Sequence, residues 1–250
     1  MEKINVVVVG YGGMGGYHAD RILEMEKFNL LGIYDIKEER RKAAEEKGIY
    51  AYPSFESVLE DKRVELITCA AYNDCHKEIA IRAMEAGINV ISEKPVTLCS
   101  EDLEEMIAAS KRTGKLFTVH QNRRWDNDYR TIKNIYDNGE LGKVHAIDSK
   151  VYGSRGIPGD WRREKRHGGG MVLDWGVHLL DQILMLNEGK KLVSVYATLT
   201  NVTNDEVDDG FRAIIKFENG PECLVEVFTN NFIEAPRWYM AGENGTAVIE

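Results

Sequence analysis

A glycine-rich turn near the start of the chain constrains the fold more than any other feature. The apolar run 4–9 leads directly into Gly10-Tyr11-Gly12-Gly13-Met14-Gly15, which matches G-x-G-x-x-G. In a strand–turn–helix unit, the first glycine permits a tight turn, the second lets the backbone approach a pyrophosphate, and the third lets the helix pack close to the strand. The turn therefore predicts a dinucleotide site, with cofactor contacts from Gly10, Gly12, Gly13, Met14 and Gly15.

An acidic residue supports this interpretation. Asp35 stands 20 residues beyond Gly15, at the end of the second apolar run, where a carboxylate can accept hydrogen bonds from the adenosine ribose. Its charge would repel a 2′-phosphate, so we expect NAD, with NADP as the alternative because Lys37 and Arg40 are close in sequence. A phosphate-hydrolysing P-loop is excluded because Gly16 and Tyr17 replace the required Lys and Ser or Thr. A glycine turn that binds no ligand is the structural alternative.

The first half of the chain alternates short β-branched runs with helical stretches. Uniformly apolar runs indicate strands that are buried on both faces. Helices are expected at 37–47 and 77–86, and Ser100 is expected to cap a helix that runs to Thr113. This alternation predicts an α/β unit with a doubly wound parallel sheet. The expected strands are 4–9, 30–34, 66–70, 89–92 and 116–119.

The pattern changes near residue 120. A helix to about Asn138 and a long strand near 144–151 precede a glycine-rich irregular segment, and an apolar helix is expected from Met171 to about Leu186. Strand after strand with hairpin-length turns then predicts an open, mostly antiparallel mixed sheet. We expect two domains, 1–120 for the cofactor and 121–250 with α+β structure. The expected late strands are 192–200, 211–217, 223–229 and 238–241.

Composition narrows the class of partner. The chain of 250 residues has 32 basic and 41 acidic residues, a formal charge of −9, which opposes nucleic acid or an anionic membrane as the main partner. The four cysteines form no C-x-x-C pair and are interpreted as reduced thiols, and no apolar run reaches the length of a membrane span. We expect a cytoplasmic protein with a small-molecule ligand.

Lys94 is the first candidate for chemistry outside the glycine turn. It lies in Glu93-Lys94-Pro95, at the carboxyl edge of the expected parallel sheet, where doubly wound folds bind ligands. This position aims Lys94 at the cofactor crevice. An ordinary surface lysine is the equally weighted alternative.

Asp174 and His178 are the second candidate. They are four residues apart, and so project from one face of an otherwise apolar helix, where their burial requires partners or a cavity. The preceding run 168–170 is interpreted as a mobile loop that approaches a substrate. A hydrogen-bonded core pair is one alternative; a metal site lacks a third ligand at suitable spacing, so we expect no metal. An acid–base role gains support if Lys94 faces the same pocket.

Two further groups of residues are ambiguous. The basic run 162–167 could bind phosphate, but we favour a solvated loop. Trp161, Trp125 and Tyr152 could be core residues or a wall on which a sugar stacks, and the sequence does not choose between these roles.

Together these motifs resemble the Gfo/Idh/MocA family, which includes glucose-fructose oxidoreductase and inositol dehydrogenase. The resemblance rests on the glycine turn, on Glu93-Lys94-Pro95 after a fifth strand, and on Gly-Gly-Gly-x-x-x-Asp-x-Gly-x-His in the second half. It covers nearly the whole chain. It implies a Rossmann domain, a second domain with an open mixed sheet, and NAD(P)-dependent oxidation or reduction of sugars, cyclitols or related polyols.

The resemblance also implies roles for individual residues. Lys94 would orient the substrate hydroxyl and the nicotinamide, His178 would be the general acid/base, and Asp174 would bind substrate and support the proton transfer. Tyr72 stands where relatives usually carry proline, which puts contacts on the nicotinamide side in doubt. The other implied contacts are Asn73, His76 and Glu93 for the cofactor and Asn122, Arg123 and Trp161 for the substrate.

Three functions remain distinct at this level. The leading one is an NAD(P)-dependent sugar or polyol oxidoreductase that forms a homodimer or homotetramer through the second sheet. An NAD-dependent glycosidase that oxidises its sugar transiently is the second, and a non-catalytic nucleotide-binding subunit is the third. Members usually exceed 300 residues, so we expect the chain to be short at its C-terminal end.

Overall fold

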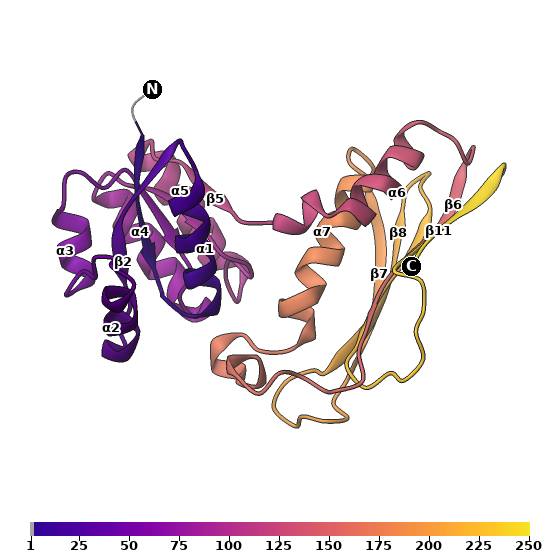
Figure 1. Cartoon of the computed structure of the whole chain (residues 1–250). Coiled ribbons are helices and arrows are strands. Elements are labelled where there is room, and N and C mark those ends of the chain that lie inside the picture. Colours follow the sequence, from indigo (N-terminus) through magenta and orange to yellow (C-terminus); the bar gives the residue numbers. More distant parts are fainter. Residues whose placement is uncertain (1–2) are drawn as a thin grey trace. The chain divides into compact units, whose positions relative to one another are not determined.

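The computed structural model describes residues 3–250. By their contacts these form two compact units, residues 3–120 and 121–250, shown in indigo to magenta and in magenta to yellow in Figure 1. Each unit has its own sheet and its own hydrophobic core.

The first unit is built on a parallel sheet of five strands in the order β2-β1-β3-β4-β5. All its pairings are parallel, as the alternating sequence pattern predicts, and this confirms the doubly wound α/β class. Glu93-Lys94-Pro95 was expected to follow the fifth strand, but in the structure it follows the fourth, β4. The strands are β1 (Ile4–Val9), β2 (Phe28–Tyr34), β3 (Leu66–Cys69), β4 (Asn89–Ser92) and β5 (Phe117–Val119).

Helices connect these strands. Ser54 caps α3 through a reciprocal capping box with Ser57, in a short helix that the sequence pattern did not predict. Ser100 is the first residue of α5 rather than its cap: Cys99 holds the N-cap position, and Gly114 ends the helix at φ +67°. The helices are α1 (Gly13–Glu24), α2 (Glu38–Glu46), α3 (Phe55–Glu60), α4 (His76–Glu85) and α5 (Ser100–Thr113).

The central strand β1 is apolar on both faces because both are covered. Val6 and Val8 pack into one cluster, with Ala19 of α1, whereas Val7 and Val9 pack into another, with Met84 of α4. This two-sided burial is why the strand appears in the sequence as an unbroken run of valines.

The second unit carries a six-stranded sheet in the order β11-β10-β6-β9-β8-β7. Its neighbours pair antiparallel except β6 with β9, which are parallel, so the sheet is mixed and mostly antiparallel, as expected. The strand β11 was not predicted. The strands are β6 (Val144–Tyr152), β7 (Leu192–Thr200), β8 (Gly210–Phe217), β9 (Glu222–Phe228), β10 (Trp238–Gly242) and β11 (Gly245–Ile249).

Two helices, α6 (Asn127–Asp137) and α7 (Val177–Leu186), cover one face of this sheet (Figure 1). Leu179 and Ile183 of α7 pack with Ile147, Val225 and Trp238 of the strands, and all five are nearly inaccessible to solvent. The expected helix from Met171 exists, but a π-helical segment, Val172–Gly176, precedes α7.

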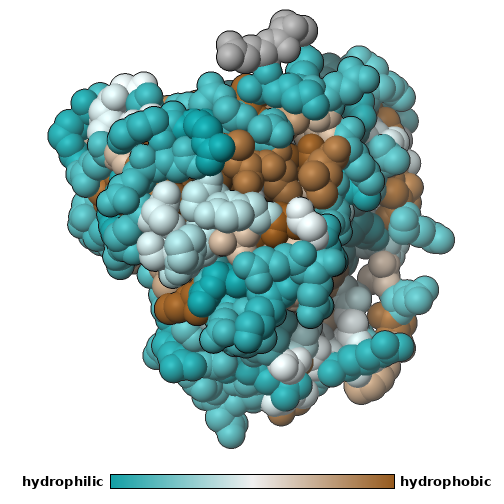
Figure 2. Space-filling view, turned by 60° about the vertical axis from the view of Figure 1, so that its left-hand side comes forward, coloured by the Kyte–Doolittle hydropathy of each residue, from teal (hydrophilic) through white to brown (hydrophobic). Residues whose placement is uncertain are grey.

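On the face seen in Figure 2, hydrophilic residues predominate and surround several apolar areas. Among residues 3–250, no helix combines the length and the apolar character that a membrane span requires.

Candidate active site

The glycine turn of the first unit is packed so closely that side chains are excluded from it. A Cβ on Gly10 (φ +89°) would lie 2.5 Å from the Ala71 nitrogen, and a Cβ on Gly15 would lie 1.8 Å from the Gly10 carbonyl oxygen. Helix α1 begins directly after Gly12, so the positive end of its dipole lies at the turn. Its first turn has no acidic residue to offset this charge. These features fit a bound pyrophosphate.

Asp35 lies just beyond β2 and is 3% exposed. Its Oδ2 accepts a hydrogen bond from the Tyr11 amide (2.7 Å) and its Oδ1 accepts one from the Lys37 amide (2.8 Å). Arg40 also pairs with Oδ2 at 3.1 Å. Burial alone would lower the pKa of Arg40, but the hydrogen bond and charge of Asp35 raise it. Asp35, the carboxylate expected to bind the ribose, therefore also holds the glycine turn through Tyr11, and it is paired with Arg40.

The segment between β3 and the start of α4 contains two of the expected cofactor residues, Asn73 and His76, and both are buried. His76 places Nδ1 3.0 Å from the Pro95 carbonyl oxygen and Nε2 3.2 Å from that of Ala71. Burial lowers the pKa of His76. Asn73 lies in a short 3-10 turn before α4. The imidazole of His76 thus holds the loop that carries Lys94, rather than projecting to solvent.

Glu93 is buried between two histidines that the sequence analysis did not single out. Its Oε1 lies 2.6 Å from Nε2 of His18, on α1, and 2.9 Å from Nδ1 of His120, just beyond β5. Burial alone would raise the pKa of Glu93, but these two contacts hold it well below its usual value. Lys94, beside it, is partly exposed, and its amide donates to Glu93 Oε2 at 3.2 Å.

In the second unit, Asp174 lies in the π-helical segment and pairs with an arginine from the basic run. Arg162 Nε donates to Asp174 Oδ2 at 2.8 Å, and Arg162 also pairs with Asp160 at 2.8 Å. Burial would lower the pKa of Arg162, but the charge of Asp174 raises it. The interpretation of 162–167 as a solvated loop is therefore wrong for Arg162, which neutralises a buried carboxylate.

The run Gly168–Gly170 serves close packing. A Cβ on Gly169 would lie 2.4 Å from the Arg162 carbonyl oxygen, and one on Gly170 (φ +98°) would lie 2.2 Å from Asp208 Oδ1. Asp208 Oδ2 accepts hydrogen bonds from the amides of Met171 and Val172, both at 2.9 Å. The run is buried and tied to these residues, which does not fit the expected mobile loop.

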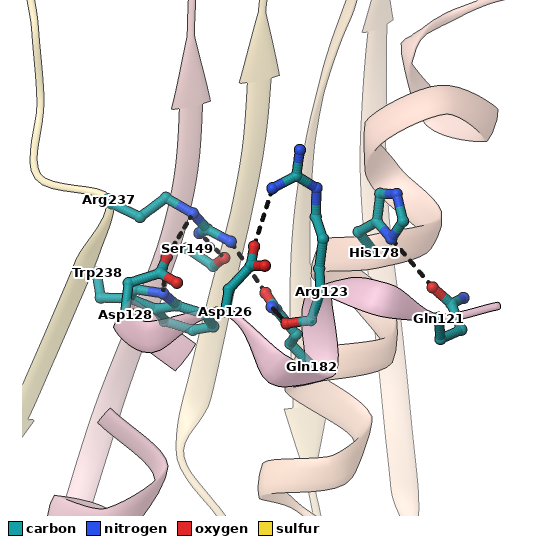
Figure 3. A network of polar contacts seen from close by, with 9 residues as sticks. All are labelled: Gln121, Arg123, Asp126, Asp128, Ser149, His178, Gln182, Arg237 and Trp238. Carbon is teal, nitrogen blue, oxygen red and sulfur yellow. Dashed lines mark hydrogen bonds and ion pairs between the residues drawn. The ribbon is translucent and has the colours of Figure 1, made fainter. Parts of the chain in front are cut away.

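His178 lies in the first turn of α7 and is 4% exposed. Its Nδ1 is 3.0 Å from Oε1 of Gln121, as drawn in Figure 3, and Gln121 Nε2 donates to the Val177 carbonyl at 3.5 Å. The second contact orients the amide so that its oxygen faces the imidazole. Asp174 and His178 are thus each held by a partner from a distant segment.

Further polar contacts fix the segment that carries Gln121 (Figure 3). Gln182 of α7 donates to the Arg123 carbonyl at 2.7 Å and accepts from Arg237 at 2.9 Å. Arg123 pairs with Asp126 at 2.9 Å, and its guanidinium lies 4.0 Å from the centre of the Trp175 ring. The expected substrate residue Arg123 is therefore rigidly placed.

Arg237 anchors the other side of this network. It donates to Ser149 Oγ at 2.6 Å and pairs with Asp128 at 3.3 Å, and Trp238 Nε1 also donates to Asp128. Burial lowers the pKa of Arg237 to about 10, which leaves it charged at neutral pH.

The remaining expected residues differ in exposure. Asn122 is exposed, and Trp161 is half-buried under the Arg162 guanidinium, 4.6 Å from its ring centre. Trp125 is 75% exposed, so it is not a core residue. Tyr152 donates to Glu226 at 2.6 Å, which with burial raises the pKa of the phenol.

Comparisons with known proteins agree with the fold of both units. The model of the oxidoreductase family with an NAD-binding Rossmann fold matches residues 4–121, and that of the GFO/IDH/MocA C-terminal domain matches residues 129–248. The chain belongs to the Gfo/Idh/MocA family. The solved NAD-binding protein from Listeria innocua is 50% identical, with a TM-score of 0.96 over 99% of this chain and 73% of that one.

Two curated Gfo/Idh/MocA relatives show the range of similarity. An uncharacterized oxidoreductase of Schizosaccharomyces pombe is 32% identical over 74% of this chain and 53% of its own length. Inositol 2-dehydrogenase of Salmonella paratyphi B is 27% identical over 89% of this chain and 66% of its own length. The chain thus spans between half and two thirds of these relatives.

Sequence reasoning missed His18, His120, Gln121 and Arg162 as partners of the candidate residues. His18 lies three residues after the glycine turn, and His120 directly follows a strand of the parallel sheet. Both are positions at the carboxyl edge, so the fold rule that singled out Lys94 applies to them as well.

The packing of Gly170 leads to a stability prediction. We expect Gly170→Ala to lower the free energy of unfolding by at least about 1–2 kcal/mol, because a Cβ is strained at positive φ and would also displace Asp208. Urea unfolding followed by circular dichroism measures this. The control is Gly159→Ala, whose Cβ would meet no described residue within 4 Å. Equal effects of the two substitutions would contradict the packing argument.

Proposed function

We propose that the protein is an NAD-dependent oxidoreductase that acts on a CH–OH group of a cyclitol, sugar or related polyol. The observation that carries the proposal is the buried His178 of the second unit, whose Nδ1 contacts the side-chain oxygen of Gln121. The first unit of the same chain carries a glycine turn of the dinucleotide-binding type. Family membership and the inositol dehydrogenase relative support the substrate class.

Gln121 determines which nitrogen of His178 can act as a base. An amide oxygen only accepts hydrogen bonds, so Nδ1 carries the proton and a neutral imidazole then has its lone pair on Nε2. Nε2 is therefore the atom that takes the proton from the substrate hydroxyl. The amide of Gln121 holds the ring in this orientation during the transfer.

Asp174 and Arg162 form an ion pair at the start of α7, the helix that carries His178. Their ion pair keeps a carboxylate charged in a buried position, where it can accept hydrogen bonds from substrate hydroxyl groups. Lys94, in the first unit, orients the reacting hydroxyl, as the family resemblance implies. The nicotinamide, when bound, supplies the hydride acceptor.

The glycine turn and Asp35 hold the cofactor. Gly10, Gly12, Gly13, Met14 and Gly15 would hold the pyrophosphate, and Asn73, His76 and Glu93 would hold the neighbouring loops that contact the cofactor. Asp35 favours NAD because its carboxylate would repel a 2′-phosphate, although Arg40 offsets part of this charge. Asn122, Arg123 and Trp161 contribute to the substrate side.

We also propose that two or four copies assemble through the second sheet. Val193, Val195 and Leu199 of the edge strand β7 are more than half exposed. Val195 is paired in register with Ile215 of β8 and Leu199 with Phe211, and both of these β8 residues are buried. An uncovered apolar edge of this kind is typical of an interface.

The catalytic roles predict a separation of turnover from cofactor binding. We expect His178→Asn and Lys94→Met each to lower kcat by at least about 100-fold, because each removes a group that moves or orients the transferred proton. NADH binding, followed by fluorescence, should be nearly unchanged. The assay is nicotinamide absorbance with a panel of cyclitols and aldoses, and the control is the exposed His145→Asn. Loss of NADH binding in both variants would indicate structural roles instead, and aglycone release without net NADH would identify a glycosidase.

Cofactor preference gives a second prediction. Asp35→Asn keeps hydrogen-bond acceptance for the Tyr11 amide but removes the charge, leaving Arg40 without its anionic partner. We expect the ratio of NADPH to NADH affinity to rise on the order of tenfold, since one charge near a phosphate is worth about 1–4 kcal/mol. Fluorescence titrations measure both affinities, with the exposed Glu39→Gln as control. An unchanged ratio would exclude Asp35 as the discriminating charge.

The assembly proposal is tested by placing charge on β7. The double variant Val195→Lys, Leu199→Lys should elute as a monomer in size-exclusion chromatography with light scattering, because two ammonium groups cannot be buried in an apolar interface. The wild-type chain and the exposed Ile36→Lys control should elute as a dimer or tetramer. A monomeric wild type would overturn the proposal.

A further inference from the structure

The cluster of His18, Glu93 and His120 has the composition of a metal site. Two imidazoles and one carboxylate come from three different elements, and one ligand atom from each lies within 4.8 Å of the others. Within residues 3–250, this is the place where at least three His, Cys, Asp or Glu side chains converge in this way. We propose that these three side chains bind a divalent transition-metal ion, with Zn²⁺ as the preferred ion.

The backbone of the cluster is already fixed in place. The Glu93 amide donates to the Cys69 carbonyl and the His120 amide donates to the Ser92 carbonyl, both at 2.8 Å, so both ligands are attached to the ends of sheet strands. His18 lies in the second turn of α1. A binding ion would therefore need little reorganisation of the main chain, and Glu93 Oε2 already has the Lys94 amide as an outer partner.

The side chains must rearrange to surround an ion, because the ligand atoms of the three residues lie up to 4.8 Å apart. Ligand atoms around Zn²⁺ lie about 3.3 Å apart at tetrahedral angles, given bonds of about 2.0–2.1 Å. The contacts of Glu93 Oε1 at 2.6 and 2.9 Å must therefore open by about half an ångström. His18 would bind through Nε2 and His120 through Nδ1, and each ring would carry its proton on the other nitrogen. Water would complete the coordination, since the His120 side chain is 32% exposed.

The ligand set also selects among ions. Two imidazoles favour Zn²⁺, Co²⁺ or Ni²⁺, whereas Mg²⁺ and Ca²⁺ prefer oxygen ligands and find only one carboxylate here. The absence of a metal motif in the sequence is explained by the wide separation of positions 18, 93 and 120, which no local spacing rule connects. The proposal does not depend on the proposed oxidoreductase activity.

Metal titration of the chelator-treated, desalted protein tests the site. We expect one equivalent of Zn²⁺ to bind in calorimetry, Co²⁺ to give the visible absorption of a low-coordinate site, and excess Mg²⁺ to displace neither. His120→Asn should weaken Zn²⁺ binding at least about tenfold, as loss of even an outer-shell partner commonly does. The double variant His18→Asn, His120→Asn should abolish it. Thermal unfolding of each variant without metal establishes that it is folded.

Two controls separate this site from other ligands. His145→Asn removes an exposed imidazole elsewhere, and Cys75→Ser with Cys99→Ser removes the two exposed thiols; both should bind Zn²⁺ like the wild type. X-ray absorption at the zinc edge of the wild-type protein should show two imidazoles and no sulfur. Lack of stoichiometric binding, undiminished binding in the double histidine variant, or a sulfur ligand would each overturn the proposal.

Discussion

Burial of charged groups together with their partners is the constraint on which both units depend. Asp35, Glu93 and Asp174 are each less than 10% exposed, and an isolated carboxylate in such a place would cost several kcal/mol. Each is held by groups from elsewhere in the chain: Arg40 and backbone amides, two histidines, and Arg162. The loops that carry the candidate functional residues are therefore ordered by the same contacts that pair those buried carboxylates.

Most of the fold follows from local sequence because its strongest signals are local. The valine run of β1 and the glycines after it define strand, turn and helix within a dozen residues, and the hairpin turns reveal the mixed sheet. The errors arise where the local signal is ambiguous or too short. Ser100 has the right chemistry for a cap, yet Cys99 occupies the cap position, and the short α3 has too few residues to show a helical period.

The candidate site was predictable to a lesser degree. Lys94 was recognised because it follows a strand at the carboxyl edge of the parallel sheet, and Asp174 and His178 because they interrupt an apolar helix. Their partners were not, because Arg162 looks like a solvated charge and Gln121 like a polar linker residue until the tertiary contacts are known. Similarly, the glycines before the π-helical segment suggested mobility, but their role is to admit the Arg162 backbone and the Asp208 side chain.

The π-helical segment Val172–Gly176 makes the helix sensitive to its length. In an α-helix each residue turns the chain by about 100°, so adding or removing one residue rotates everything before it by that angle relative to everything after it. A π turn contains such an extra residue, and Asp174 lies inside it while His178 lies just beyond. The angular relation between carboxylate and imidazole is thus set by residue count. Substitutions that keep this count leave the relation intact, whereas a single deletion would turn the carboxylate away from Arg162.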